Sequence, residues 1–172
     1  MKAAAIWLAT VLGVALLAHL GSIWYAPRYI MGVAMDRLAA DGGVNVFIER
    51  PLADAGSRDI VRPSPDLMYS VCVVDVSAGP VRIRAPASAP YSSVSVFAAN
   101  SDNILVMNDL ALAPGADFDI WVGKPRQKVP VSAPSAILRS ERGIVLIRRV
   151  VTDAEQAKAL DALRREARCE QK

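Results

Sequence analysis

Outside the apolar N-terminus of this sequence, the side chains best able to do chemistry are carboxylates. Two carboxylates held at a suitable separation can hydrolyse a glycosidic bond, and several together can bind calcium. Asp117 and Asp119 are two residues apart, so they share one face if their segment is a strand. Aspartates beside turns more often accept turn hydrogen bonds, and we favour that interpretation over catalysis or metal binding. The candidates are Asp66, Asp75, Asp102, Asp109, Asp117 and Asp119.

Histidine is missing from most of the chain. The only one, His19, lies in the apolar N-terminal run. This excludes a Ser–His–Asp or Cys–His mechanism within the chain, and also histidine-ligated zinc, iron or copper. No glycine-rich phosphate loop is present. We therefore expect no cofactor and no metal, and we favour a non-enzymatic function, with an aspartate-dependent enzyme as an alternative.

One segment, residues 62–70, groups side chains that are suited to ligand binding. It reads Arg-Pro-Ser-Pro-Asp-Leu-Met-Tyr-Ser. In the structural interpretation, which we favour, Arg62 pairs with Asp66 to pin the loop and the Tyr69 hydroxyl ties a strand end to the backbone. The functional interpretation is a ligand-binding rim formed by Arg62, Asp66, Tyr69 and Asn100.

This segment resembles the bacterial family catalogued as domain of unknown function 1254. That family has a similar run of proline, asparagine, a variable residue, aspartate, threonine or a similar residue, leucine, tyrosine and serine, followed by Asp-Leu-Ser, Gly-Pro and a valine-rich strand. Residues 91–100 resemble its Tyr-x-Ser-Val strand, and residues 143–149 with the helix after them resemble its closing strand and helix. The resemblance spans about residues 44–169. Ser64 replaces the family's asparagine, so a functional role of that asparagine does not transfer.

The resemblance implies little about activity, because the activity of that family is not established. Larger members join this domain to a second β-rich domain, catalogued as domain of unknown function 1214. A chain of 172 residues is too short to contain both. The resemblance therefore implies, as a hypothesis, a separate membrane-anchored partner that carries the second domain.

The N-terminus is predicted to be a membrane anchor. Residues 3–26 contain no Asp, Glu, Lys or Arg, and about 20 apolar residues in a helix cross the hydrocarbon core. The run is longer than the apolar part of a signal peptide, about 7–15 residues. We expect residues 1–27 to be an uncleaved, single-pass signal anchor in the bacterial inner membrane, in contact with the bilayer through residues 3–26. The flanking basic residues nearly balance, and we favour a periplasmic domain.

Residues 28–172 are predicted to form a β-rich soluble domain of the α+β class, mainly antiparallel, as a sandwich or an open barrel. An amphipathic helix is expected over residues 28–40. A capping box that starts at Thr152 predicts a C-terminal amphipathic helix that runs to about Cys169. Alternating patterns and turn signals predict strands over residues 44–48, 69–76, 81–84, 91–99, 104–107, 118–122 and 143–151.

Charge and cysteines leave alternatives open. Basic residues predominate over residues 124–172, and we interpret them as a solvated helix face and loop, with no nucleic acid expected. Cys72 lies in an apolar run and Cys169 near the C-terminus, a placement that favours unpaired thiols, although an oxidising compartment would permit a disulfide.

These features together predict a membrane-anchored envelope protein whose domain binds a protein partner. A binding module for a small molecule or glycan, built on the segment that contains Arg62 and Tyr69, is the alternative.

Overall fold

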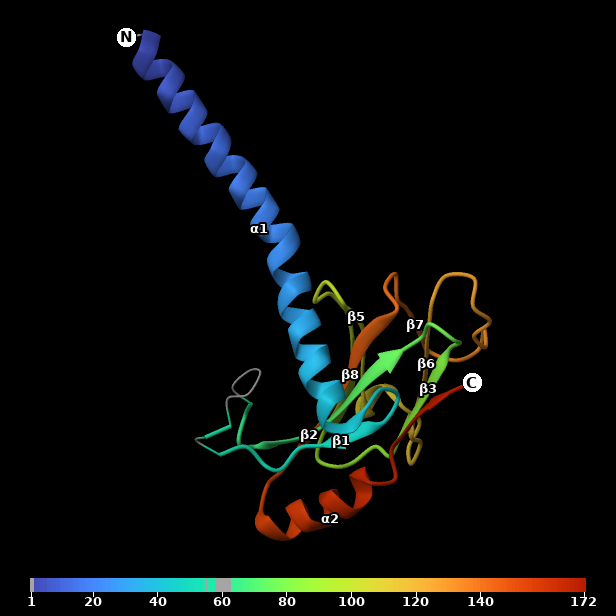
Figure 1. Cartoon of the computed structure of the whole chain (residues 1–172). Helices are drawn as coiled ribbons and strands as arrows, with labels where there is room; N and C mark the ends of the chain where they lie inside the picture. The colour runs from blue at the N-terminus through green and yellow to red at the C-terminus, as the bar shows by residue number, and fades with distance from the viewer. Residues whose placement is uncertain (1, 55, 58–62) are drawn as a thin grey trace.

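One helix, α1 (Lys2–Gly42), carries the whole apolar N-terminal run away from the sheets (Figure 1). The structure is a computed structural model that describes residues 2–54, 56–57 and 63–172. The helical segments predicted on either side of Pro27 are continuous, with Pro27 inside the helix. Proline is more frequent in membrane-spanning helices than in soluble ones. At about 1.5 Å per residue, the helix is a rod roughly 60 Å long.

The two halves of α1 have different surroundings. All its described residues up to Ala26 are exposed, and an 18-residue window has a mean hydropathy of 2.1, so this helix is long and apolar enough to cross a membrane. The second half packs against a sheet through Ala34, Met35 and Leu38. The helix therefore joins an apolar exposed segment directly to the folded domain.

The first sheet is antiparallel throughout, and α1 packs on its outer face. Its strand order is β1-β2-β8-β4-β5, so strands that are distant in sequence lie side by side. The strands are β1 (Phe47–Glu49), β2 (Leu67–Asp75), β8 (Arg142–Val150), β4 (Ser92–Ala98) and β5 (Asn103–Asn108).

The second sheet packs on the inner face of the first. Its order is β7-β6-β3-β9, and only the β6–β7 pair is parallel. The sheets make a sandwich, not a closed barrel, so the predicted mainly antiparallel α+β class is confirmed. Each of the seven predicted strands overlaps an observed one, whereas β7 and β9 were not predicted. The strands are β7 (Ser135–Ile137), β6 (Phe118–Gly123), β3 (Val81–Ala85) and β9 (Arg168–Gln171).

Two apolar clusters form because successive strand residues point to opposite faces. Between the sheets, β-branched and aromatic side chains such as Val74, Ile83 and Phe118 are fully buried. On the outer face of the first sheet, Val71 and Val73 pack against α1. The strands β2, β4 and β8 are thus covered on both faces where α1 lies.

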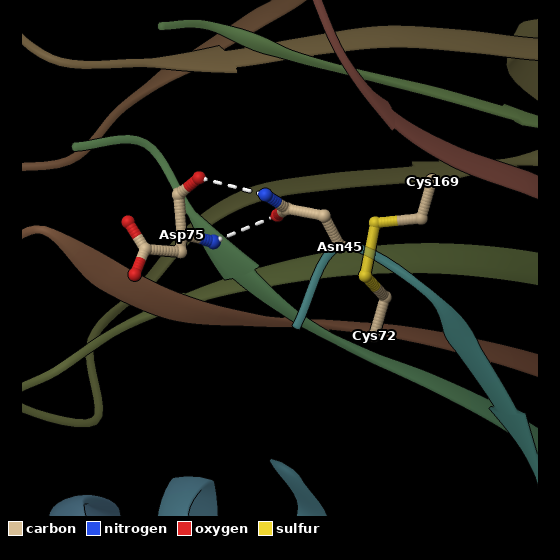
Figure 2. Close-up of a disulfide and its surroundings, with 4 residues drawn as sticks. All are labelled: Asn45, Cys72, Asp75 and Cys169. Atoms are coloured by element: carbon tan, nitrogen blue, oxygen red, sulfur yellow. Dashed lines mark hydrogen bonds between the residues drawn. A yellow bond between two sulfur atoms is a disulfide. The ribbon is translucent and has the colours of Figure 1, made fainter. Parts of the chain in front are cut away.

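A disulfide between Cys72 of β2 and Cys169 of β9 links the two sheets (Figure 2), with a Cα–Cα distance of 6.7 Å. The expectation of unpaired thiols was wrong, because the placement of Cys72 in an apolar run and of Cys169 near the C-terminus did not show that β9 brings the two together. Helix α2 (Ala154–Arg164) ends before Cys169, and the chain then turns back and pairs with β3, with Cys169 opposite Ile83.

Helix α2 lies at the opposite end of the sandwich from the exposed half of α1 (Figure 1). Its N-cap is Asp153, one residue after the predicted Thr152. The Asp153 carboxylate accepts hydrogen bonds from the N–H groups of Glu155 and Gln156. The Gln156 side chain accepts from the Thr152 N–H at 2.7 Å. A carboxylate can accept both orphan donors at once, which explains why the cap shifts to Asp153.

Candidate functional site

The segment predicted as a ligand rim is only partly described, because Arg62 lies outside the described residues. Asp66 is exposed just before β2, and its backbone carbonyl accepts from the Val151 N–H at 2.9 Å. The Tyr69 hydroxyl oxygen accepts from the Ser64 N–H at 3.0 Å. This is the backbone tie expected in the structural interpretation, and it holds the loop before β2 against the sheet.

Asn100 does not lie with these residues. Sheet register puts Tyr69 opposite Arg148, and Arg148 opposite Ser93, near the start of β4. Asn100 follows β4 at its other end, where its amide donates to the Asp102 carboxylate at 2.6 Å. The described members of the predicted rim therefore occupy two ends of the first sheet.

The candidate carboxylates at turns accept local hydrogen bonds. Asp75 accepts from the N–H and hydroxyl of Ser77, which lowers the pKa of the Asp75 carboxyl. The backbone of Asp75 is held by the side chain of Asn45, which donates to the Asp75 carbonyl and accepts from its N–H (Figure 2). Asp109 accepts from the Ser92 N–H. The Asp75 contacts match the turn role that we favoured for such aspartates, whereas the Asp109 contact joins residues 17 positions apart.

Asp117 and Asp119 have different surroundings. Asp119 lies in β6 and accepts two hydrogen bonds from the Arg82 guanidinium of β3, at 2.9 and 2.5 Å. These bonds hold the pKa of Asp119 below its usual value. Asp117 precedes the strand and is exposed. In the part of the chain that the structure describes, no three His, Cys, Asp or Glu side chains form a group suited to a metal ion.

A buried polar cluster between the sheets was not predicted. Arg149 of β8 is fully buried, and its guanidinium donates to the Pro86 carbonyl at 3.1 Å and to the Ser70 hydroxyl at 3.5 Å. The Ser70 hydroxyl in turn donates to the Glu49 carboxylate at 2.7 Å. Burial lowers the pKa of Arg149, and the nearby Glu49 charge opposes that shift. Within the described ranges, Arg149 Nε has no hydrogen-bond partner.

Arg164 of α2 completes this cluster. Its Nη1 donates to the carbonyls of Arg50 and Tyr69 at 2.6 and 3.2 Å, and its Nε lies 3.2 Å from Glu49 Oε2. Asp161 also accepts from it. The cluster clamps α2 to the ends of β1 and β2, which is a structural role. The signal in the sequence was Arg148-Arg149 inside a strand, because adjacent strand residues must face opposite ways.

A cleft of about 940 Å³ lies between α1 and two chain reversals, the β4–β5 turn and the β7–β8 loop. Asn100 lines this cleft, whereas Asp66 and Tyr69 do not. Basic and apolar side chains share its walls. They include Arg28, Met35, Ile104, Ile137, Arg139 and Arg142.

The edge of the first sheet is open at β5. This strand reads Asn-Ile-Leu-Val-Met-Asn, with no charged residue. Val106 is 58% exposed on the outer face, and Leu110, just beyond the strand, is 83% exposed. Natural edge strands are usually protected by charges, prolines or covering segments. No strand among the described residues pairs with β5 on the side away from β4, although β7 of the second sheet lies close to part of β5.

Comparison with known proteins identifies a family and a fold. Residues 44–171 match the family model described as "Protein of unknown function (DUF1254)". No curated protein matches the chain. The crystal structure of the VPA0106 protein from Vibrio parahaemolyticus is similar, with a TM-score of 0.64 and 14% identity, over 89% of this chain and 38% of that one. A putative uncharacterized protein from Burkholderia cenocepacia has a TM-score of 0.48 and 15% identity, over 91% and 42% of the two chains.

The chain thus spans about two-fifths of the length of these solved proteins. At 14% identity, the likeness to VPA0106 establishes the sandwich fold and nothing about activity.

Proposed function

The chain belongs to the DUF1254 family of proteins of unknown function, and we propose that it is an exported, membrane-anchored protein whose sandwich binds a protein partner along β5. The observation that carries this proposal is the apolar, uncharged edge strand with Val106 exposed beside it. Such an edge can accept a strand from another chain, with backbone hydrogen bonds for affinity and side-chain contacts for specificity.

Membrane anchoring is supported by the first half of α1. Its apolar side chains are exposed along the whole segment up to Ala26. Exposure of so many large apolar groups to water is unfavourable, whereas a bilayer would cover them. The direct test is extraction of membranes with alkaline carbonate: an anchored chain stays in the membrane pellet, and release into the supernatant would contradict anchoring.

A periplasmic location of the domain is supported by the Cys72–Cys169 disulfide, because such bonds persist in oxidising compartments and are rare in the cytosol. To test it, we would place one cysteine at the exposed Lys158 in a chain that lacks both native cysteines. A membrane-impermeant maleimide should label Lys158→Cys in cells with a permeabilised outer membrane. Labelling only after lysis of the inner membrane would place the domain in the cytoplasm instead.

The partner that we propose is a chain that carries the companion domain of unknown function 1214. Larger members of the family join the two domains in one polypeptide, so an interface between them needs only modest affinity there. When the two domains are in separate chains, anchoring both chains in one membrane would similarly raise the local concentration of each domain near the other.

A photo-crosslinking experiment tests both the partner and the edge. The full chain is expressed with a 1214-domain protein from the same bacterium, and a photoreactive phenylalanine replaces Val106 or, as a control on α2, Lys158. We expect a crosslinked heterodimer from position 106 and none from 158. Val106→Lys should weaken co-purification at least tenfold, whereas Val106→Thr should retain it. Equal crosslinking from both positions, or none from 106, would contradict the proposal.

Ligand binding is the second candidate function. The cleft lined by Asn100 favours it, since its volume of about 940 Å³ lies within the range typical of small-molecule sites, about 300–1,000 Å³. The aspartate-dependent enzyme stays a prediction, to be tested with Asp66→Asn once an activity is found.

A further inference from the structure

The cleft beside α1 lies next to the end of the exposed apolar run of that helix. We propose that it binds the phosphate headgroup of an anionic phospholipid in the leaflet from which α1 emerges. This inference rests on the membrane anchoring proposed above. The exposed apolar run ends at Ala26, and Arg28, the first charged residue after it, lines the cleft. The cleft therefore lies at the level of the headgroups.

The arrangement of the loops supports this position. The β4–β5 turn, the β7–β8 loop and the longer loop between β6 and β7 all lie at the end of the sandwich from which α1 departs (Figure 1). Helix α2 lies at the other end. The same end of the domain therefore carries every chain reversal that lines the cleft, facing the membrane that α1 would enter.

Arg28 is positioned to meet a phosphate at the membrane surface. Its guanidinium carbon lies 4.6 Å from the Trp24 ring centroid, and its Nη1 donates to the Trp24 carbonyl at 2.5 Å. Tryptophan rings favour the headgroup level of a bilayer. Trp24 and Arg28 therefore form a unit that suits the interface, and the remaining guanidinium N–H groups can donate to phosphate oxygens.

The charge balance of the cleft leaves two arginines available. Arg142 of the cleft pairs with Asp36 of α1 at 2.9 Å, and Glu141 of the cleft lies 3.7 Å from Lys124 Nζ. The Asp102 carboxylate accepts from the neutral Asn100 amide and keeps its negative charge. The lining residues still carry three arginines (Arg28, Arg139 and Arg142) against two carboxylates (Asp102 and Glu141). Arg28 and the exposed Arg139 form no ion pair with the described part of the chain. A phosphate would supply the anion that they lack.

Apolar walls distinguish a lipid from a soluble anion. Met35, Ile104 and Ile137 line the cleft beside the arginines, and the two isoleucines are partly exposed. The glycerol and first acyl carbons below a headgroup would contact such side chains. On the neighbouring β6–β7 loop, Arg126 and Lys128 are exposed and Val131 is fully exposed. That loop would add basic and apolar contacts to the same membrane surface.

Native mass spectrometry of the full chain in a mild detergent tests the inference. Phosphatidylglycerol and phosphatidylcholine with identical acyl chains are added in equal amounts, and the lipids retained on the protein are counted. Each basic side chain near an anionic lipid surface strengthens binding by about fivefold. With two arginines in the cleft, we expect phosphatidylglycerol to be preferred over phosphatidylcholine by more than tenfold. Equal retention of the two lipids would overturn the inference.

Substitutions test whether the preference for phosphatidylglycerol arises in the cleft. Arg28→Gln with Arg139→Gln should abolish it, and Arg139→Gln alone, at an exposed loop position, should reduce it about fivefold. The control, Lys158→Gln with Arg165→Gln, removes one exposed charge from α2 and one from its C-cap, and it should leave the preference unchanged. An equal loss in the control would overturn the inference in favour of general charge attraction. Displacement of the lipid by equimolar soluble glycerol phosphate would overturn it in favour of a soluble-anion site.

The two proposals fail separately. If carbonate releases the chain from membranes, anchoring fails, and the lipid inference falls with it. If the chain stays in the membrane pellet but shows no preference for phosphatidylglycerol, only the lipid inference fails.

Discussion

Cys72 of β2 and Cys169 of β9 form a disulfide that joins the inner faces of the two sheets across a sequence separation of 97 residues. Cys72 is fully buried and Cys169 nearly so. Among the described strands, β9 pairs with β3 alone. The disulfide therefore attaches β9 to β2, and backbone pairing with β3 is the main other interaction that holds β9 in place.

Removing this disulfide should destabilise the domain strongly. Closing a loop of this length restricts the unfolded chain, and the loop-entropy relation predicts a loss of about 4.7 kcal/mol in the free energy of unfolding when the bond is absent. The measurement is urea unfolding of the full chain in mild detergent, followed by tryptophan fluorescence. Cys72→Ala with Cys169→Ala leaves no free thiol, and wild type with added reductant should behave similarly. A midpoint unchanged in both samples would contradict the prediction.

Arg164→Met should also be strongly destabilising. It removes the donor to the Arg50 carbonyl and one of the donors to the Tyr69 carbonyl and the Glu49 carboxylate. Breaking a buried ion pair from one side costs about 3 kcal/mol or more. The matched control is the next residue, Arg165→Met, whose side chain is 70% exposed and pairs with Asp161 at the surface. It should change the urea midpoint far less. Equal effects of the two variants would refute the clamp role of Arg164.

Asp119 should contribute stability that depends on pH. Hydrogen bonds from Arg82 hold the pKa of Asp119 below its ordinary value of 3.8 in the folded chain. The unfolded state therefore binds the proton more readily, so the contribution is fully present above about pH 5 and is lost as pH falls through the folded-state pKa. Wild type should be more stable than Asp119→Asn at pH 6, and the difference should shrink by pH 3. If the difference in stability is the same at pH 3 and pH 6, the hydrogen bonds from Arg82 do not stabilise the ionised Asp119 carboxylate in the folded chain.

Strands with local signals could be predicted from the sequence. Alternation in Val81-Arg82-Ile83-Arg84 and the turns that follow it are visible within a few residues. Strand β9 could not be predicted in this way, because Arg165 to Arg168 are mostly good helix formers by composition. Pairing with β3 and the disulfide override that local preference. Strand β7 is only three residues long, in a proline-rich segment, and offers little pattern to detect.

The candidate site, like the strands, could be predicted from the sequence only where its contacts are local. The contact between Ser64 and Tyr69 spans five residues, so a local interpretation anticipates it. The separation of Asn100 from Tyr69 depends on the register of three strands, which local patterns do not determine. The burial of Arg149 requires knowing which face of β8 meets the second sheet. The cleft at Arg28 requires knowing that α1 continues through Pro27 and packs on the first sheet.

Packing of α1 on the first sheet gives the last prediction. Leu38 is 4% exposed and lies against the cluster that contains Val71 and Ile144. Leu38→Ala should lower the free energy of unfolding by about 2–4 kcal/mol, because it removes buried methyl groups and leaves a cavity. It should also loosen the helix, so that limited proteolysis in detergent cuts between α1 and β1 faster than in wild type. Leu110→Ala, at an 83% exposed position, is the control and should change neither measurement. If Leu38→Ala leaves both the urea midpoint and the cleavage rate unchanged, α1 and the sandwich are not packed together in solution, and the cleft between them would lose one wall.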